Sequence, residues 1–155
     1  MGKIFFMVAV ILLFAGCERI EVYKSGNKSG EPLEFTKGEV QCVKCTMALE
    51  GKEHSAQAVL PDGKTYFFDD PGCLALWIAD KKLDGVRLWV YTDDTHRYID
   101  ARKAHYRLGV HTPMNYGFGV YEEPVEGSVG FEEFVRMMQR GENMTNPAIR
   151  QRYTQ

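Results

Sequence analysis

Two cysteines and a methionine lie within six residues of one another, in the segment Cys42-Val43-Lys44-Cys45-Thr46-Met47. Two cysteines at this spacing can chelate one metal ion from a loop, as they do in zinc sites. A methionine thioether is a soft, neutral donor that suits Cu(I) and serves Zn²⁺ poorly. In an extended segment, Cys45 and Met47 would point to the same side, because alternate residues do. The segment therefore predicts a Cu(I) site of low coordination number.

A second set of soft donors lies in the loop His111-Thr112-Pro113-Met114-Asn115-Tyr116-Gly117-Phe118-Gly119, whose proline and glycines are typical of turns. Met114 follows the proline and has polar neighbours, so two roles are open: a metal ligand displayed on a stiff turn, or a filler of the core. His111 is a further candidate ligand, and a hydrogen-bonded surface histidine is its alternative role.

Cys73 lies close to the start of a predicted helix. A buried, unreactive thiol is the ordinary role of a single cysteine. A helix N-terminus, however, lowers the pKa of a thiol and makes it a better ligand. Cys73 could therefore complete a three-cysteine site with Cys42 and Cys45.

Two other chemistries also use a pair of cysteines at this spacing. A thiol-disulfide oxidoreductase would carry Cys42 and Cys45 at the start of a helix that follows a strand. Gly51 leaves little room for such a helix here. A structural zinc site would combine Cys42, Cys45 and Cys73, with or without a histidine. Both remain alternatives to Cu(I) binding.

The N-terminus has the pattern of an export signal. Lys3 is followed by 13 apolar or small residues, 4–16, too few for a membrane span of about 20 and typical of a secretory signal. Ala15-Gly16 before Cys17 resembles a bacterial lipobox, in which the signal is cleaved and the cysteine is acylated. We therefore expect residues 1–16 to be a signal peptide, Cys17 to carry lipid, and the protein to face the periplasm or extracytoplasmic side of the cell envelope. An ordinary secretory signal or a short uncleaved anchor is the alternative.

The composition bounds the other function classes. Hydrophobic residues make up 45% and charged residues 26%, which is ordinary for a globular domain. With 19 Lys+Arg and 21 Asp+Glu, the formal net charge is −2, so no basic excess is available to neutralise phosphates and we expect no nucleic-acid partner. Of the four cysteines, Cys17 is assigned to lipid, and the other three cannot all pair with one another.

The elements that position these residues can be read from local signals. Residues 17–37 are polar and are predicted to form a flexible tether. Pro61-Asp62-Gly63 joins two β-rich runs as a hairpin. Asp69-Asp70 can cap a helix that begins at Pro71, and residues 86–91 alternate as a strand.

The second half repeats this pattern more loosely. Short strands are predicted over residues 97–101, 104–108 and 116–121. A helix follows, capped by Ser128 and ended by Gly141. The predicted fold class is α+β, with two small tandem β-β-α-containing modules. The predicted domain spans residues 38–142, its modules are 38–95 and 96–142, and residues 143–155 form a polar tail.

Taken together, four pieces in this order resemble the NosL family: the lipobox, the C-x-M segment, the stretch HSAQAVLPDGKTYFFDDPGC and the loop TPMNYGFG. The resemblance runs from Cys17 to about Arg140. NosL proteins are cell-envelope lipoproteins that act as Cu(I) chaperones in the assembly of nitrous oxide reductase during denitrification. The resemblance also implies a fold of two small β-β-α-containing modules.

The resemblance implies ligands and partners as well. It makes Cys45 and Met47 ligands of Cu(I) and Met114 a third donor, while Cys42 fits an extended C-x-x-C-x-M form of the motif. Asn115 stands where glycine would be expected. The implied partners are an extracytoplasmic copper enzyme or its ABC-type assembly machinery, together with the membrane through the lipid on Cys17. The implied role is delivery of copper without catalysis.

Overall fold

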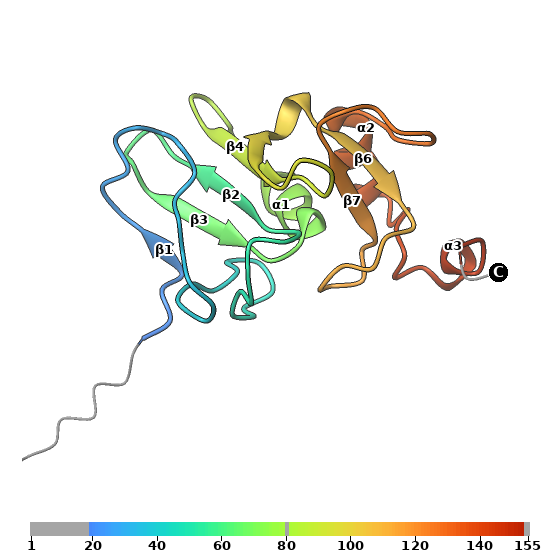
Figure 1. Ribbon diagram of the computed structural model, residues 1–155, viewed down its shortest axis with the longest axis horizontal. Coiled ribbons are helices and arrows are strands. Elements are labelled where there is room, and N and C mark those ends of the chain that lie inside the picture. The colour runs from blue at the N-terminus through green and yellow to red at the C-terminus, as the bar shows by residue number, and fades with distance from the viewer. Residues whose placement is uncertain (1–18, 80, 154–155) are drawn as a thin grey trace, which may run out of the picture.

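Two antiparallel sheets, each packed with a helix, make up the part of the chain that the computed structural model describes, residues 19–79 and 81–153 (Figure 1). The predicted α+β class with two small β-β-α-containing modules is confirmed. The larger sheet has the order β1-β3-β2-β4-β5, and β6 pairs with β7 in the smaller one. The bounds are β1 Tyr23–Lys24, β2 Ala56–Val59, β3 Thr65–Phe68, β4 Arg87–Tyr91, β5 Tyr98–Asp100, β6 His105–Leu108 and β7 Phe118–Tyr121, with helices α1 Pro71–Ile78, η1 Ala101–Lys103, α2 Phe131–Gln139 and α3 Pro147–Arg150.

The predicted hairpin lies at the centre of the larger sheet. Ala56 of β2 is opposite Phe68 of β3, and Val59 is opposite Thr65. The turn is closed by the Gly63 backbone N–H, which donates to the Leu60 carbonyl at 2.9 Å. Gly63 has φ +81°, and a Cβ there would lie 3.1 Å from the Asn27 backbone. Glycine is therefore required both by the backbone conformation and by the close approach.

Helix α1 begins as predicted and lies between the two sheets (Figure 1). The Asp70 side chain accepts a hydrogen bond from the Gly72 N–H at 2.8 Å, and Pro71 occupies the first helical turn. A Cβ at Gly72 would lie 2.5 Å from the Tyr116 ring, so glycine there lets the loop before β7 pack directly on the helix. Because α1 contacts β2, β7 and α2, its N-terminus is fixed relative to both modules.

The smaller module packs around aromatic rings. Phe134 of α2 stacks on Tyr106 with ring centroids 4.1 Å apart and meets Phe118 edge-on at 4.8 Å. Gly141 ends the helix as predicted, with φ +70° and its N–H donating to the Met138 carbonyl. The predicted Ser128 cap is wrong. Gly130 is the N-cap, and the Ser128 hydroxyl instead accepts a hydrogen bond from the Val125 N–H.

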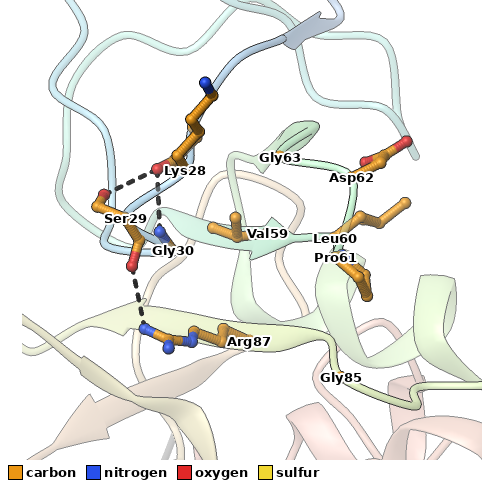
Figure 2. A pocket seen from close by; sticks show the side chains of 11 residues that line it. Lys28, Ser29, Gly30, Val59, Leu60, Pro61, Asp62, Gly63, Gly85 and Arg87 are labelled. Carbon is orange, nitrogen blue, oxygen red and sulfur yellow. Dashed lines mark hydrogen bonds between the residues drawn. The ribbon is translucent and has the colours of Figure 1, made fainter.

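The predicted tether over residues 17–37 is wrong for its described part, residues 19–37. Strand β1 pairs with β3, and the buried Asn27 donates to Thr65 at 3.0 Å. Figure 2 shows the following loop, where Arg87 donates to the Ser29 carbonyl at 3.2 Å. Side chains of the sheet thus satisfy backbone groups of a polar segment, an interaction that composition alone does not reveal. The predicted signal peptide and the lipid site Cys17 lie outside the described residues.

Two predicted boundaries also differ from the structure. Strand β5 pairs with β4 in the larger sheet, so the first module extends past residue 95 to Asp100. The segment from Asn143, predicted to be a polar tail, begins as part of the fold: the Met144 N–H donates to the Tyr116 carbonyl at 3.0 Å, and Asn143 is 4% exposed. Within residues 19–79 and 81–153, no helix is long and apolar enough to cross a membrane.

Candidate metal centre

Cys42 is fixed in the core by a short hairpin-like loop. Its N–H donates to the Met47 carbonyl at 2.8 Å, and its carbonyl accepts from the Thr46 N–H at 2.9 Å. An isolated bridge joins Cys42 to Phe67 of β3. Cys42 is fully buried, and its Sγ lies 3.5 Å from the Cys45 backbone N–H, which points at it as a donor. This arrangement presents the Cys42 sulfur toward the end of β3.

Cys45 lies at the outer edge of the same loop. It is partly exposed, and its thiol donates to Asp69 Oδ1 at 3.1 Å. Asp69 follows β3 directly and is 6% exposed. Its second oxygen, Oδ2, is buried and has no hydrogen-bond partner among the described residues. A buried carboxylate oxygen without a partner is costly, unless a proton or a metal ion approaches it.

Cys73 comes to the same point from the first turn of α1. It is fully buried, and the Asp70 carbonyl accepts a hydrogen bond from its N–H at 2.9 Å. Asp70 uses its two carboxylate oxygens separately. Oδ1 caps the helix, and Oδ2 accepts from the Met114 N–H at 3.0 Å. The helix cap therefore also ties the Thr112–Asn115 loop to the helix start that carries Cys73.

Four potential ligand atoms converge here: one from each of Cys42, Cys45, Cys73 and Asp69. These atoms all lie within 4.8 Å of one another. The three cysteines are free thiols, so no disulfide removes them. Three sulfurs and one oxygen at this spacing can surround a single metal ion. Because two of the cysteines are fully buried and Cys45 is not, an ion bound here is reached from the Cys45 side.

The electrostatics favour a thiolate at the deepest position. The pKa of Cys42 is lowered to about 7, chiefly because Cys73 donates a hydrogen bond to its sulfur and also through backbone N–H donors. Burial raises the pKa of Cys45 to about 12. The pKa of Cys73 is raised far above its usual range by its hydrogen bond to Cys42 and by burial. Cys42 is thus the first sulfur to ionise, and metal binding must displace protons from the other two.

The predicted methionine donors lie at the rim of this cluster. Met47 is 49% exposed, and it lines a pocket of about 210 Å³ together with Asp69 and Pro113. Met114 is half-buried and packs partly against the core. His111 is exposed and is not among the four converging residues. The structure therefore brings Met47 and the loop of Met114 to the edge of the thiol cluster.

The predicted geometry of the C-x-M segment is wrong. Thr46 has φ +67°, so the backbone between Cys45 and Met47 is left-handed and not extended, and the alternation of sides does not hold. A second left-handed residue, Asn115 at φ +55°, lies in the other donor loop. Asparagine tolerates this conformation almost as well as glycine does, which explains Asn115 at a position where glycine was expected.

The redox alternative fits this geometry poorly. The pair Cys42 and Cys45 lies on a turn between two bridges and does not begin a helix. The cysteine with the lowered pKa, Cys42, is the fully buried one. A dithiol enzyme needs its low-pKa thiolate within reach of a substrate disulfide.

Two neighbours of the site were missed by sequence reasoning. The sequence predicted that Asp69 and Asp70 together cap the helix. A single residue caps a helix. The presence of two adjacent aspartates therefore indicated that one of them was available for another role. Tyr116 packs over Gly72, and its pKa is raised to about 12 by burial first and then by the nearby sulfurs and carboxylates.

Comparisons with protein-family models, curated proteins and solved structures find no match to this chain. The site must therefore be judged on its own geometry. The pocket of about 340 Å³ in Figure 2 carries no cysteine, histidine or methionine among its lining residues. Among the described residues, the thiol cluster is the place where soft ligands converge.

Proposed function

We propose that the protein is a membrane-tethered Cu(I) carrier that delivers copper to an extracytoplasmic enzyme, with nitrous oxide reductase as the recipient. The observation that carries the proposal is the cluster of three free cysteines. Two of them, Cys42 and Cys73, are buried, and Cys45 is partly exposed. Thiolates are the ligands that Cu(I) prefers. An open edge allows ligands of a partner to replace those of the carrier one at a time.

The exposed thioether of Met47 supports a role in transfer. Its sulfur is carried at the rim, next to the edge by which the ion is reached. A neutral thioether stabilises Cu(I) and carries no proton that must leave. Met47 and Met114 would thus hold the ion weakly as it enters or leaves, while the three cysteines retain it.

The resemblance to NosL supports the recipient and the location. The motifs that carry it include the C-x-M segment, where Cys45 donates to Asp69, and the TPMNYGFG loop, where the Met114 N–H donates to the neighbouring Asp70. On this proposal the lipid on Cys17 holds the carrier at the membrane, where it meets the copper enzyme or its ABC-type assembly machinery. The protein has no catalytic step of its own.

A structural zinc module is the second candidate, favoured by the carboxylate of Asp69. Three cysteines and one carboxylate make a four-ligand set of the kind that surrounds Zn²⁺ in closed sites. The two functions differ in what the metal does for folding. A structural zinc ion contributes folding free energy outright, whereas a transferable copper ion must leave without unfolding its carrier.

Titration with Cu(I) tests the proposal. The full chain, purified in detergent under reducing and anaerobic conditions, competes with a coloured Cu(I) chelator for the metal. We expect one ion per chain and at least about a hundredfold weaker binding in Cys45→Ala, since loss of even an outer-shell partner costs about 10–100-fold. Met47→Leu should weaken binding less, and Met137→Leu, in α2, should not change it. Equal Cu(I) affinity in Cys45→Ala and the unmodified chain would contradict the proposal.

The same preparation distinguishes the Cu(I) carrier from the structural zinc module. Circular dichroism is recorded before and after a strong chelator removes the bound metal. The carrier keeps its spectrum and its cooperative thermal transition, because the two sheets and the stacked aromatic rings of the smaller module hold the fold without a metal ion. Loss of the folded spectrum together with tight Zn²⁺ binding would favour the structural zinc module.

A further inference from the structure

A second group of metal-ligating side chains lies outside the thiol cluster, where the loop before β2 meets the turn between β4 and β5. Two of the four histidines of the chain gather there, His54 and His96. With Asp93, Glu53, Tyr91 and Thr92 they line a pocket of about 130 Å³. The Cu(I) proposal above makes no use of these residues.

The contact between His54 and Asp93 is unusual. His54 Nδ1 is buried and has no hydrogen-bond partner among the described residues, yet Asp93 Oδ1 lies 3.5 Å from it. That distance is long for a hydrogen bond. Two ligands that each lie about 2.1 Å from one tetrahedrally coordinated ion are about 3.4 Å apart. The spacing therefore fits an edge of a metal coordination sphere, as well as fitting an ion pair between the two side chains.

The scaffold holds Asp93 and His54 in place. The Asp93 N–H donates to the Val120 carbonyl at 2.7 Å, and Asp93 Oδ2 accepts from the Val120 N–H at 3.3 Å. This leaves Oδ1 directed at His54. Next to His54, the Ser55 hydroxyl bonds to both the Lys52 carbonyl and the Tyr98 hydroxyl. Ligands presented by such fixed backbone lose little entropy when they bind an ion.

His96 provides a third donor. It lies on the tight turn that closes when the Thr92 N–H donates to the Arg97 carbonyl at 3.0 Å. It is close enough to Asp93 for their charges to interact. Its exposed side chain lines the same pocket. Its ring must turn toward Asp93 to complete the set, because the ligand atoms of these residues do not converge as those of the thiol cluster do.

The backbone at both histidines is left-handed, with φ +61° at His54 and +51° at His96. The other left-handed non-glycine residues among those described are Thr46 and Asn115, one in each donor loop of the thiol cluster. Such residues are uncommon and concentrate at functional sites. His54 and His96 thus share their backbone conformation with residues that lie in the two donor loops of the first site.

We propose that His54, His96 and Asp93 form a second metal site, which takes a divalent transition-metal ion of the Zn²⁺ or Cu²⁺ class. Imidazole nitrogens with one carboxylate suit these ions, whereas Cu(I) prefers the sulfurs of the first site. The exposed Glu53 is the available fourth ligand, and a water molecule is the alternative to it. This proposal is independent of the function of the thiol cluster.

The two proposed sites are adjacent and share lining residues. His54 and Glu53 also line the pocket of about 210 Å³ that contains Met47 and Asp69. A divalent ion at the second site therefore lies beside the open edge of the first. The protein would then carry two metal sites of different ligand preference on one connected surface.

Cobalt(II) is the probe that tells the sites apart, because thiolate ligands give it an intense charge-transfer absorption that nitrogen and oxygen ligands do not. The full chain, without an added histidine tag, is titrated with Co²⁺ under reducing, anaerobic conditions. Calorimetry gives the affinity, and the absorption spectrum identifies the ligands. We expect one Co²⁺ ion to bind without thiolate absorption, whether or not the thiol cluster also takes Co²⁺ or has been filled with Cu(I).

Matched variants identify the residues that bind this Co²⁺ ion. His54→Asn with His96→Asn removes both rings but keeps a residue that tolerates the left-handed backbone. His105→Asn with His111→Asn removes the other two histidines. The first pair should weaken the thiolate-free Co²⁺ binding by about a hundredfold or more, and the second pair should leave it unchanged.

Two results would overturn the proposal. One is Co²⁺ binding that shows thiolate absorption only, and the other is unchanged thiolate-free binding when His54 and His96 are both replaced. Should the double variant fail to fold by circular dichroism, Asp93→Asn and the single His96→Asn supply the same comparison. A failure of this test leaves the Cu(I) titration of the thiol cluster unaffected, so the two proposals can fail separately.

Discussion

At the scale of single residues, the site depends on how its protons are distributed. Cys42 has the lowered pKa, about 7, while the pKa of Cys45 is raised to about 12. The Cys42 thiolate is stabilised by donors that approach it from Cys73 and from the Cys45 backbone. In the metal-free protein, Cys42 is thus the cysteine that ionises above about pH 7, while Cys45 and Cys73 keep their protons.

This distribution predicts how metal affinity changes with pH. If all three cysteines bind the ion, about two protons must leave above pH 7, from Cys45 and Cys73, and about three below it, because Cys42 is then protonated too. Affinity therefore falls as pH falls, and it falls more steeply below about 7. Competition titrations with a Cu(I) chelator at several pH values measure the slope. A slope that stays constant through neutral pH would show that Cys42 does not bind the metal as a thiolate.

At the scale of elements, the start of α1 joins the two donor loops. Asp70 caps the helix with one oxygen and holds the Met114 N–H with the other. The sequence predicted the cap, the proline and the hairpin before it, because each is a local signal of known geometry. It could not predict the bond to Met114, which joins residues 44 positions apart.

Asp70→Ala should therefore lower the free energy of unfolding by more than the loss of an ordinary helix cap does. Loss of a helix cap lowers the free energy of unfolding by about 0.5–2 kcal/mol, and the Met114 N–H loses its partner as well. We expect a total loss of about 2–3 kcal/mol in chemical denaturation, together with weaker Cu(I) binding. Asp62→Ala is the matched control, since Asp62 is exposed and accepts one local hydrogen bond from Lys64. Equal stability of the two variants would show that Asp70 does not hold the Met114 loop to the start of α1.

The left-handed backbone at Asn115 gives a second test at this scale. Asn115→Gly should leave the free energy of unfolding nearly unchanged, because glycine adopts φ +55° without strain. Asn115→Ala should lower it by about 1–2 kcal/mol, because a Cβ opposes the left-handed conformation. Thermal unfolding of the two variants makes the comparison. An alanine variant as stable as the glycine variant would contradict the assigned backbone.

At the scale of the whole molecule, sequence reasoning reached the fold class and named a three-cysteine site as one possibility, but it misjudged the N-terminal segment. The composition of residues 19–37 is that of a tether, and its docking depends on partners in the sheet such as Trp89, whose indole N–H donates to the Gly30 carbonyl at 2.9 Å. The role of Asp69 was missed for a similar reason. Its contact with Cys45 spans 24 positions and leaves no local pattern.

The docked segment should contribute to stability. Trp89→Phe keeps most of the packing but leaves the Gly30 carbonyl without its donor, at a cost of about 1 kcal/mol. Amide hydrogen exchange of residues 19–37 is the measurement, because a docked segment is protected and a tether is not. We expect protection in the unmodified chain and faster exchange around Gly30 in the variant. Exchange at the rate of an unfolded peptide throughout this segment would contradict the docking.

The central claim is that three cysteines from two distant segments hold one Cu(I) ion. X-ray absorption spectroscopy at the copper edge of the Cu(I)-loaded full chain tests this most directly, because it counts and identifies the ligand atoms. The account predicts a first coordination shell made of sulfur, and fewer sulfurs in Cys73→Ser, whose replaced side chain comes from α1. A shell dominated by nitrogen or oxygen, or one that Cys73→Ser leaves unchanged, would contradict it.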